Sequence, residues 1–388
     1  MTYKRLGDFI REVNVRNEEF KITNLLGVNL SKRFFPSIAN IIGTDLSKYK
    51  VIQKNQFGCK FMSVGRDGIL PISIMKDDKP AIISSAYYVF ESKDEMVLSP
   101  DYLMMWLRRP EFDRQLWFYS GGDVRGGVNY DDFCEMPIFI PPIDRQREIV
   151  EEYETLSRRI RLNEQMIEKL EATALALYRK MFVDGIDKEN LPEGWSMGTI
   201  GDLCEISSSK RIFESEYCHE GVPFYRGKEI TQKKNGEPIT DLIYISKERY
   251  LELVGKYGKP TQGDILLTAV GTIGNSYMVQ NEEFYFKDGN LVWFHNFSCV
   301  GANNYIYQFL QNGFDSVVEE IAIGSTQKAL TIQSLLQLEI LIPNDRTLNK
   351  FGDSVSALYN KIQVHKQENS RLSELQSLLL AKMGNLKQ

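Results

Sequence analysis

The feature that most constrains this chain is a long helical pattern that occurs twice. From residue 149 to residue 181, mostly apolar residues recur at alternating steps of four and three, which is the a/d pattern of a coiled coil. The same spacing returns 202 residues later, with no insertion inside either stretch. The core positions this predicts are Ile149, Tyr153, Leu156, Ile160, Asn163, Ile167 and Leu170, and then Phe351, Val355, Leu358, Ile362, His365, Asn369 and Leu372.

The segments in front of the two helices also correspond. Gly122 matches Gly324 at the same offset of 202, and the opening Gly7-Asp8 matches Gly201-Asp202 at an offset of 194. A chance match would not hold across a loop and a whole helix, so we infer an internal duplication. The expected fold class is α+β, with two mixed domains that are each followed by a long helix. The predicted boundaries are domain 1–142, helix 143–182, linker 183–192, domain 193–344 and helix 345–388.

Within the first domain, short apolar runs predict strands and two longer stretches predict helices. The strands are expected at 60–64, 69–74, 86–90 and 137–142, and the helices at 100–108 and 111–119.

Composition sets broad limits on the function. The five cysteines show no CxxC spacing, so we expect reduced thiols rather than a zinc site or a disulfide framework. The sequence has neither the apolar core of a signal peptide nor an apolar run near the ~20 residues that span a bilayer, so a cytoplasmic protein without membrane contact is expected. A net charge of −5 argues mildly against a bulk nucleic-acid binder, although binding depends on where the basic groups cluster.

Motifs for chemistry are missing from the sequence. It contains no Walker A sequence and no GxGxxG after a strand, and the three histidines lack metal-ligand spacing. We therefore expect no catalytic residue and no metal site in this chain.

Basic and polar residues set in turns with glycine and aromatic residues are the candidates for DNA contact. Arginine can pair with guanine and glutamine with adenine, while lysine and backbone N–H groups hold phosphates. The alternatives are that these residues are solvated surface charges, or that the glycine loops at 121–127 and 324–328 cradle a nucleotide phosphate, although the Lys-Ser/Thr ending of such a loop is missing. The candidates are Lys32, Arg33, Arg66, Arg125, Lys210, Arg211, Arg226, Lys228, Thr326, Gln327 and Lys328.

Several motifs of the second half, in this order, resemble the specificity subunit of type I restriction-modification systems. They are Leu191-Pro-Glu-Gly-Trp195, Ile200-Gly-Asp-Leu203, Pro223-Phe-Tyr-Arg-Gly-Lys-Glu-Ile230, Gly263-Asp-Ile-Leu-Leu267, Gly271-Thr-Ile-Gly274 and Gly324-Ser-Thr-Gln-Lys328. The first half departs more from the pattern, with Gly121-Gly-Asp-Val-Arg125 in place of the last motif.

The resemblance implies that each domain is a target recognition domain for one half of a split site in double-stranded DNA. It also implies that the helices pair antiparallel as a spacer and dock two methyltransferase (modification) subunits, with restriction subunits as further partners. No cofactor is expected in this chain. S-adenosylmethionine would belong to the methyltransferase partner, and ATP and magnesium to the restriction partner.

Three readings compete with this one. A coiled coil could serve only homodimerisation, the duplicated domains could be a protein-binding scaffold without DNA specificity, or the chain could be an enzyme with an unrecognised site. The presence of both helix copies in one chain favours an internal antiparallel pair, in which Asn163 faces Asn369 and Ile167 faces His365. A helix over 149–181 would be about 50 Å long, enough to separate two half-sites by roughly one turn of duplex, ~34 Å.

Overall fold

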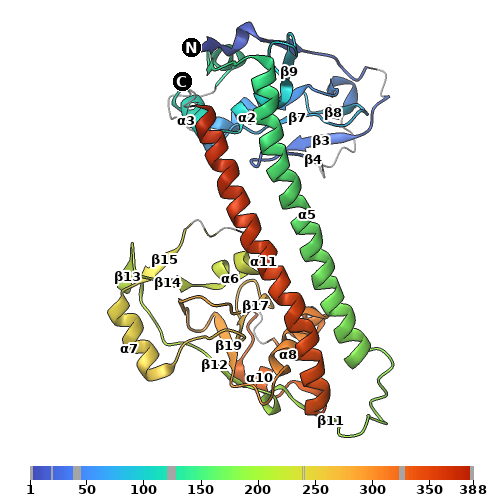
Figure 1. The fold of residues 1–388 in the computed structure, drawn as a ribbon, viewed down its shortest axis with the longest axis vertical. Helices are drawn as coiled ribbons and strands as arrows, with labels where there is room; N and C mark the ends of the chain where they lie inside the picture. The colour runs from blue at the N-terminus through green and yellow to red at the C-terminus, as the bar shows by residue number, and fades with distance from the viewer. Residues whose placement is uncertain are drawn as a thin grey trace. The chain divides into compact units, whose positions relative to one another are not determined.

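The protein is described by a computed structural model (Figure 1). It describes residues 3–18, 21–37, 45–119, 128–237, 239, 241–322 and 328–384, with the backbone alone at 315. The chain forms two compact units. Unit 1 comprises Met1–Arg161 and Asn369–Gln388, and unit 2 comprises Leu162–Glu368.

The globular part of unit 1 mixes short strands with short helices. Its strands are β1 (Lys4–Arg5), β2 (Ile10–Val13), β3 (Leu25–Val28), β4 (Phe34–Pro36), β5 (Lys50–Ile52), β6 (Phe57–Cys59), β7 (Ile72–Ile74), β8 (Ala81–Ile83), β9 (Tyr88–Ser92) and β10 (Pro137–Ile138). Its helices are η1 (Leu6–Asp8), η2 (Leu46–Lys48), η3 (Phe61–Ser63), α1 (Val64–Asp67), α2 (Pro100–Leu107), α3 (Pro110–Tyr119) and α4 (Tyr130–Cys134).

Unit 2 has a globular part of the same kind. Its strands are β11 (Ser196–Thr199), β12 (Glu205–Ser207), β13 (Tyr217–Cys218), β14 (Val222–Tyr225), β15 (Ile243–Ile245), β16 (Ile265–Thr268), β17 (Ser276–Met278), β18 (Tyr285–Phe286), β19 (Leu291–His295) and β20 (Glu339–Ile342). Its helices are η4 (Ile200–Asp202), η5 (Glu214–Glu216), α6 (Gly227–Asn235), α7 (Lys247–Tyr257), α8 (Ala302–Gln311), α9 (Phe314–Ile321) and α10 (Ile332–Leu336).

The sheet topology repeats between the units. The order β2-β9-β6-β7 in unit 1 matches β12-β19-β16-β17 in unit 2, and all these pairings are antiparallel. In a second sheet, β3 pairs with β4 antiparallel and with β8 parallel, as β14 does with β15 and β18. A third pairing joins the start and end of each domain, β1 to β10 and β11 to β20. The equivalence of these strands extends the internal duplication from the sequence to the fold.

The predicted long helices are present as α5 (Ile143–Phe182) and α11 (Asp345–Met383). In unit 1, Gln376 of α11 donates to Ser157 of α5. In unit 2, the α5–α11 contacts run from Asn163 with Glu368, through Glu171 with Lys366, to the rings of Tyr178 and Phe351. Residue numbers rise along one helix as they fall along the other, so the pair is antiparallel.

All the expected core positions of the two helices are buried or half-buried. Asn163 is almost fully buried and its Nδ2 donates to Oε2 of Glu368 at 3.0 Å. Glu368 directly precedes Asn369, the residue predicted to face Asn163. The polar position of α5 is therefore satisfied by a side chain of α11, which is how a buried asparagine fixes the register of a coiled coil.

A fully buried glutamine anchors the start of α5 in unit 1. Nε2 of Gln146 donates to the carbonyl oxygens of Val97 and Pro141, each at 2.8 Å, and its Oε1 accepts from the backbone N–H of Ser99 at 2.9 Å. Both amide hydrogens and the amide oxygen of Gln146 thus have partners, which offsets the cost of burying an amide.

One predicted strand is wrong. Residues 60–64 form the turn of η3 and the start of α1 instead of a strand. The run is apolar, but Met62 is exposed while Phe61, Ser63 and Val64 are buried, which fits a helical turn better than alternation. Gly68, with φ of 66°, ends α1 in the left-handed conformation that glycine adopts without cost. The described residues include no helix that is long and apolar enough to cross a membrane.

Candidate nucleic-acid interface

Several predicted DNA contacts belong to equivalent places in the two units. In unit 1, the turn between β3 and β4 carries Lys32 and Arg33, and the β6–β7 connection carries Arg66. In unit 2, the segment after β14 carries Arg226 and Lys228, and the β16–β17 connection carries the Gly271–Gly274 loop. The duplication therefore places candidates from distant parts of the sequence on corresponding elements.

Lys32 holds the unit 1 elements together from inside. Its Nζ donates to both carboxylate oxygens of Asp113 at 2.7 and 2.8 Å and to the carbonyl of Leu107 at 2.5 Å. The backbone N–H of Leu70, in the β6–β7 connection, donates to the same carboxylate. Burial lowers the pKa of the Lys32 ammonium and raises the pKa of the Asp113 carboxyl. With all its donors engaged inside the domain, Lys32 has none to offer a phosphate.

Arg33 and Arg66 differ in their availability. Arg33 is exposed and forms no ion pair among the described residues. Arg66 is exposed too, but its guanidinium makes two 2.8 Å hydrogen bonds to Asp67. These bonds raise the pKa of Arg66 and lower that of Asp67. Arg66 would have to exchange its neighbour for a base or phosphate in order to contact DNA.

Arg226 of unit 2 is likewise paired. It precedes α6, and its Nε and Nη2 donate to the carboxylate of Glu229 at 3.1 and 2.6 Å. Burial alone would raise the pKa of Glu229, but the hydrogen bonds and charge of Arg226 outweigh it and leave that pKa below its ordinary value. This charge-assisted pair fixes the start of α6.

The Gly271–Gly274 loop is fastened to α6 through Asn275. Nδ2 of Asn275 donates to Thr231 at 3.0 Å, and its Oδ1 accepts from Nζ of Lys234 at 2.9 Å. Lys228 is exposed on the same helix and lies 3.1 Å from Asp241. Lys233, the remaining lysine of this helix, forms an ion pair with Glu282. Lys234 and Asn275 were not among the predicted contacts. The two adjacent lysines in Gln232-Lys-Lys-Asn235 were a sequence feature from which Lys234 could have been predicted.

Lys328 lies beside the Gly271–Gly274 loop. Its neighbour Ala329 forms a β-bridge with Val270, and the N–H of Leu330 donates to the carbonyl of Ala269 at 2.9 Å. Residues 328–330 therefore lie beside the Gly271–Gly274 loop, although they are more than fifty residues apart in sequence. Lys328 is exposed and forms no ion pair among the described residues. We call the surface formed by α6, residues 271–275 and Lys328 the α6 surface.

Three predicted contacts, Arg125, Thr326 and Gln327, lie outside the described residues.

Lys210 and Arg211 contact other elements of unit 2. The Nζ of Lys210 is 4.9 Å from the ring centroid of Tyr257 in α7. Arg211 is exposed, with its guanidinium 5.8 Å from the ring centroid of Phe213 and its Nε 3.7 Å from Asp288. Serines before Lys210 fix the segment, as Ser209 donates to the carbonyl of Phe286. A cation beside an exposed ring can stack on a base as well as bind a phosphate.

Among the described residues, no group of histidine, cysteine, aspartate and glutamate side chains could hold a metal ion.

Comparisons with known proteins identify the family to which this chain is similar. The type I restriction modification DNA specificity domain matches residues 60–172 and 192–374, one match in each half of the duplicated chain. A Haemophilus influenzae protein assigned to the specificity subunits of type I restriction enzymes is 31% identical over 227 residues, which cover 58% of this chain and 56% of that protein. The HindI specificity subunit of the same organism is 21% identical over 98% of each chain. The crystal structure of the S subunit of the type I system of M. genitalium is similar in fold, with a TM-score of 0.58, 15% identity, and coverage of 98% of this chain and 95% of that one.

The family matches both halves of the chain, and the fold has the duplicated topology and the two long helices. Together these observations identify the family more specifically than any single sequence motif. The chain belongs to the type I restriction-modification specificity subunit family.

Proposed function

We propose that this chain selects the DNA target of a type I restriction-modification complex, reading a bipartite site with one domain on each half. One observation carries the proposal: the same sheet topology occurs twice, yet corresponding positions hold different side chains, such as a buried Lys32 in one unit and the α6 lysines in the other. Repeating a scaffold while changing its surface suits the recognition of two different half-sites.

In this proposal the α6 surface of unit 2 holds phosphates and base edges. Lys328 supplies an exposed ammonium group, and Lys228 supplies another after release from Asp241. The backbone of the Gly271–Gly274 loop can approach the duplex closely because glycine has no side chain. In unit 1, the corresponding role falls to Arg33 and, after release from Asp67, to Arg66. Lys210 and Arg211 would form a second contact region of unit 2.

We further propose that the chain itself performs no chemistry. It would dock adenine methyltransferase subunits, which carry S-adenosylmethionine, and also restriction subunits, which use ATP and magnesium, in the cytoplasm. The α5 and α11 helices would set the gap between half-sites. Forty residues at about 1.5 Å each make α5 about 60 Å long, which exceeds one turn of duplex, ~34 Å.

Mapping methylated adenines across the genome with and without this gene tests the central proposal. We expect a bipartite, asymmetric motif that disappears with the gene. Exchanging residues 1–142 for the first domain of a relative should then change one half of that motif only. A motif unchanged by the exchange would contradict the proposal that each domain reads one half of the site. Removing four residues from each long helix should shorten the gap between the halves.

The salt dependence of DNA binding tests the α6 surface. Replacing Lys228 and Lys328 with glutamine should weaken binding at every sequence and reduce the salt slope by about 2, since each phosphate contact contributes about 1. The matched control is Lys247→Gln with Lys256→Gln, which removes two exposed lysines of α7. An equal loss in the control would show that net charge, rather than this surface, governs binding. A scaffold without DNA specificity would bind with no sequence preference at all.

A further inference from the structure

One side chain, that of Asn275, joins α6 to the Gly271–Gly274 loop. Its Nδ2 donates to Oγ1 of Thr231 at 3.0 Å, and its Oδ1 accepts from Nζ of Lys234 at 2.9 Å. Thr231 and Lys234 lie on α6, less than one helical turn apart. The two bonds fix which way the amide points, because exchanging its nitrogen and oxygen would set a donor against the ammonium of Lys234.

The backbone of Asn275 is held in place by Thr268. This threonine ends β16 and is fully buried, and its Oγ1 accepts from the backbone N–H of Asn275 at 2.9 Å. The backbone N–H of Thr268 donates to the carbonyl of Asn275, also at 2.9 Å. The start of α6 lies against the same threonine, since a Cβ on Gly227 would be 3.7 Å from Cγ2 of Thr268. The amide oxygen that meets Lys234 therefore occupies a fixed place in unit 2.

Among the lysines of α6, Lys234 differs in the charge of its partner. Lys228 pairs with the carboxylate of Asp241. Lys233 pairs with the carboxylate of Glu282. Lys234 forms no ion pair among the described residues, and the group that accepts its hydrogen bond is a neutral amide. An amide oxygen orients an ammonium group without neutralising it, so the positive charge of Lys234 stays available to an anion.

A carboxylate at the place of Asn275 would attract Lys234 more strongly, because a full negative charge would then face the ammonium. Unit 1 has that arrangement at Lys32, whose buried ammonium is paired with Asp113 and has no donor left for a phosphate. Lys234 is instead half-buried, and one of its N–H donors bonds Asn275. A lysine ammonium has three N–H donors, so two of them remain for an acceptor outside the described residues.

We infer that Asn275 is a positioning residue, which holds the ammonium of Lys234 beside the Gly271–Gly274 loop so that it binds a phosphate of the DNA backbone. The inference rests on the proposed function and deepens it, because it adds a phosphate contact to those of Lys228 and Lys328. The contact from Lys234 requires no ion pair to be broken, whereas Lys228 must first leave its carboxylate partner. A lysine that is already held in place also loses less side-chain freedom when it contacts DNA.

The test is the salt dependence with which the full-length chain binds a fluorescently labelled duplex carrying the mapped methylation motif, measured by anisotropy. Lys234→Gln should lower the slope of log affinity against log salt concentration by about 1 and weaken binding about fivefold at ~0.15 M salt, because one phosphate contact is lost. Asn275→Asp should have the same effect although the lysine is still present, because a carboxylate would neutralise it. Lys234→Arg should restore the slope that Lys234→Gln loses, because the charge returns.

The matched control is Asn303→Asp, which makes the same change of charge at another half-buried asparagine of unit 2. Asn303 lies in α8, and its Nδ2 donates to the carbonyl of Gly263 at 3.1 Å. This variant should leave the salt slope unchanged, because the residue is not part of the α6 surface. Thermal melts accompany both variants. Asn275→Asp should melt within a few degrees of the wild type, because an ion pair with Lys234 replaces the hydrogen bond to Thr231.

An unchanged salt slope in Lys234→Gln or in Asn275→Asp would overturn the inference. A lower melting temperature of Asn275→Asp with an unchanged slope would show that this asparagine is only structural. An equal fall in slope in Asn303→Asp would also refute the inference, because net charge would then govern binding. A wild-type chain that binds no duplex would refute the proposed function and this inference with it. If replacing Lys228 and Lys328 lowers the slope but Asn275→Asp does not, this inference alone is wrong.

Discussion

The buried Lys32–Asp113 pair gives a quantitative prediction for unit 1. The two side chains are 6% and 12% exposed, and together they join the β3–β4 turn, α3 and the β6–β7 connection. Replacing Lys32 with methionine keeps much of the side-chain volume but leaves the carboxylate of Asp113 buried without its cation. Breaking one partner of such a pair costs about 3–5 kcal/mol, and we expect a loss of that size in the free energy of unfolding of this domain.

The double variant Lys32→Met, Asp113→Leu should lose much less. Burial lowers the pKa of Lys32 and raises that of Asp113, so desolvation outweighs the attraction between the two charges. Removing both charges therefore recovers the desolvation cost. It leaves the N–H of Leu70 and the carbonyl of Leu107 without these partners, at about 1–2 kcal/mol each before relaxation. We expect a net loss of about 1–2 kcal/mol.

Hydrogen exchange in increasing urea, followed on peptides covering residues 100–119, measures the stability of this domain separately from the rest of the chain. The DNA salt slope is measured in parallel under native conditions and should not change. A Lys32→Met chain with unaltered stability and a salt slope lower by about 1 would refute the reasoning, because Lys32 would then be holding a phosphate.

Three further perturbations test unit 2 and the anchoring of α5. Gly301→Ala should destabilise unit 2 by more than ~3 kcal/mol, because the backbone has a φ of 88° and a Cβ there would lie 2.1 Å from the carbonyl oxygen of Leu348. Gly236→Ala should cost only about 1–2 kcal/mol, because Gly236 has a φ of 71° but open space around it. Thermal melts of the two variants compare these losses. Glu229→Gln should make stability fall less steeply at acidic pH. The native pKa of Glu229 is depressed, so its contribution to stability is present above its unfolded pKa of about 4.3 and is lost as the pH falls through the native value. An unchanged acid dependence in titrations monitored by circular dichroism would contradict this. Gln146→Leu should cost more than ~2 kcal/mol in unit 1, measurable by hydrogen exchange at residues 97–99, because three backbone groups lose their partner.

The candidate interface shows how far residue types in a sequence can predict a site. Lys32 and Arg33 are adjacent basic residues beside aromatic ones and gave the same signal, yet one is buried and the other exposed. Lys32 adopts a positive φ of 58°, and its side chain turns into the domain to meet Asp113, which is 81 residues away in sequence. No local pattern encodes such a partner. Lys328 was predicted from its motif, but its place beside the Gly271–Gly274 loop depends on the Val270–Ala329 bridge.

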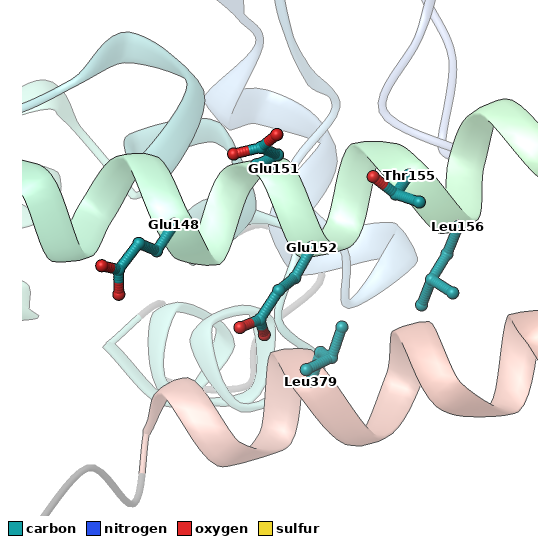
Figure 2. A pocket seen from close by; sticks show the side chains of 6 residues that line it. All are labelled: Glu148, Glu151, Glu152, Thr155, Leu156 and Leu379. Atoms are coloured by element: carbon teal, nitrogen blue, oxygen red, sulfur yellow. The ribbon is translucent and has the colours of Figure 1, made fainter.

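By itself, the sequence determined the two long helices, their heptad core positions and the duplication, because helical periodicity and repeated spacing are properties of neighbouring residues along the chain. It also carried the motifs of the family. The tertiary structure decided which basic residues are available to a partner, since a long-range ion pair such as Lys32–Asp113 depends on which side chains the fold brings within hydrogen-bond distance. It likewise decided that three glutamates, a threonine and two leucines line one groove (Figure 2), because that groove exists only where α5 and α11 lie side by side in unit 1.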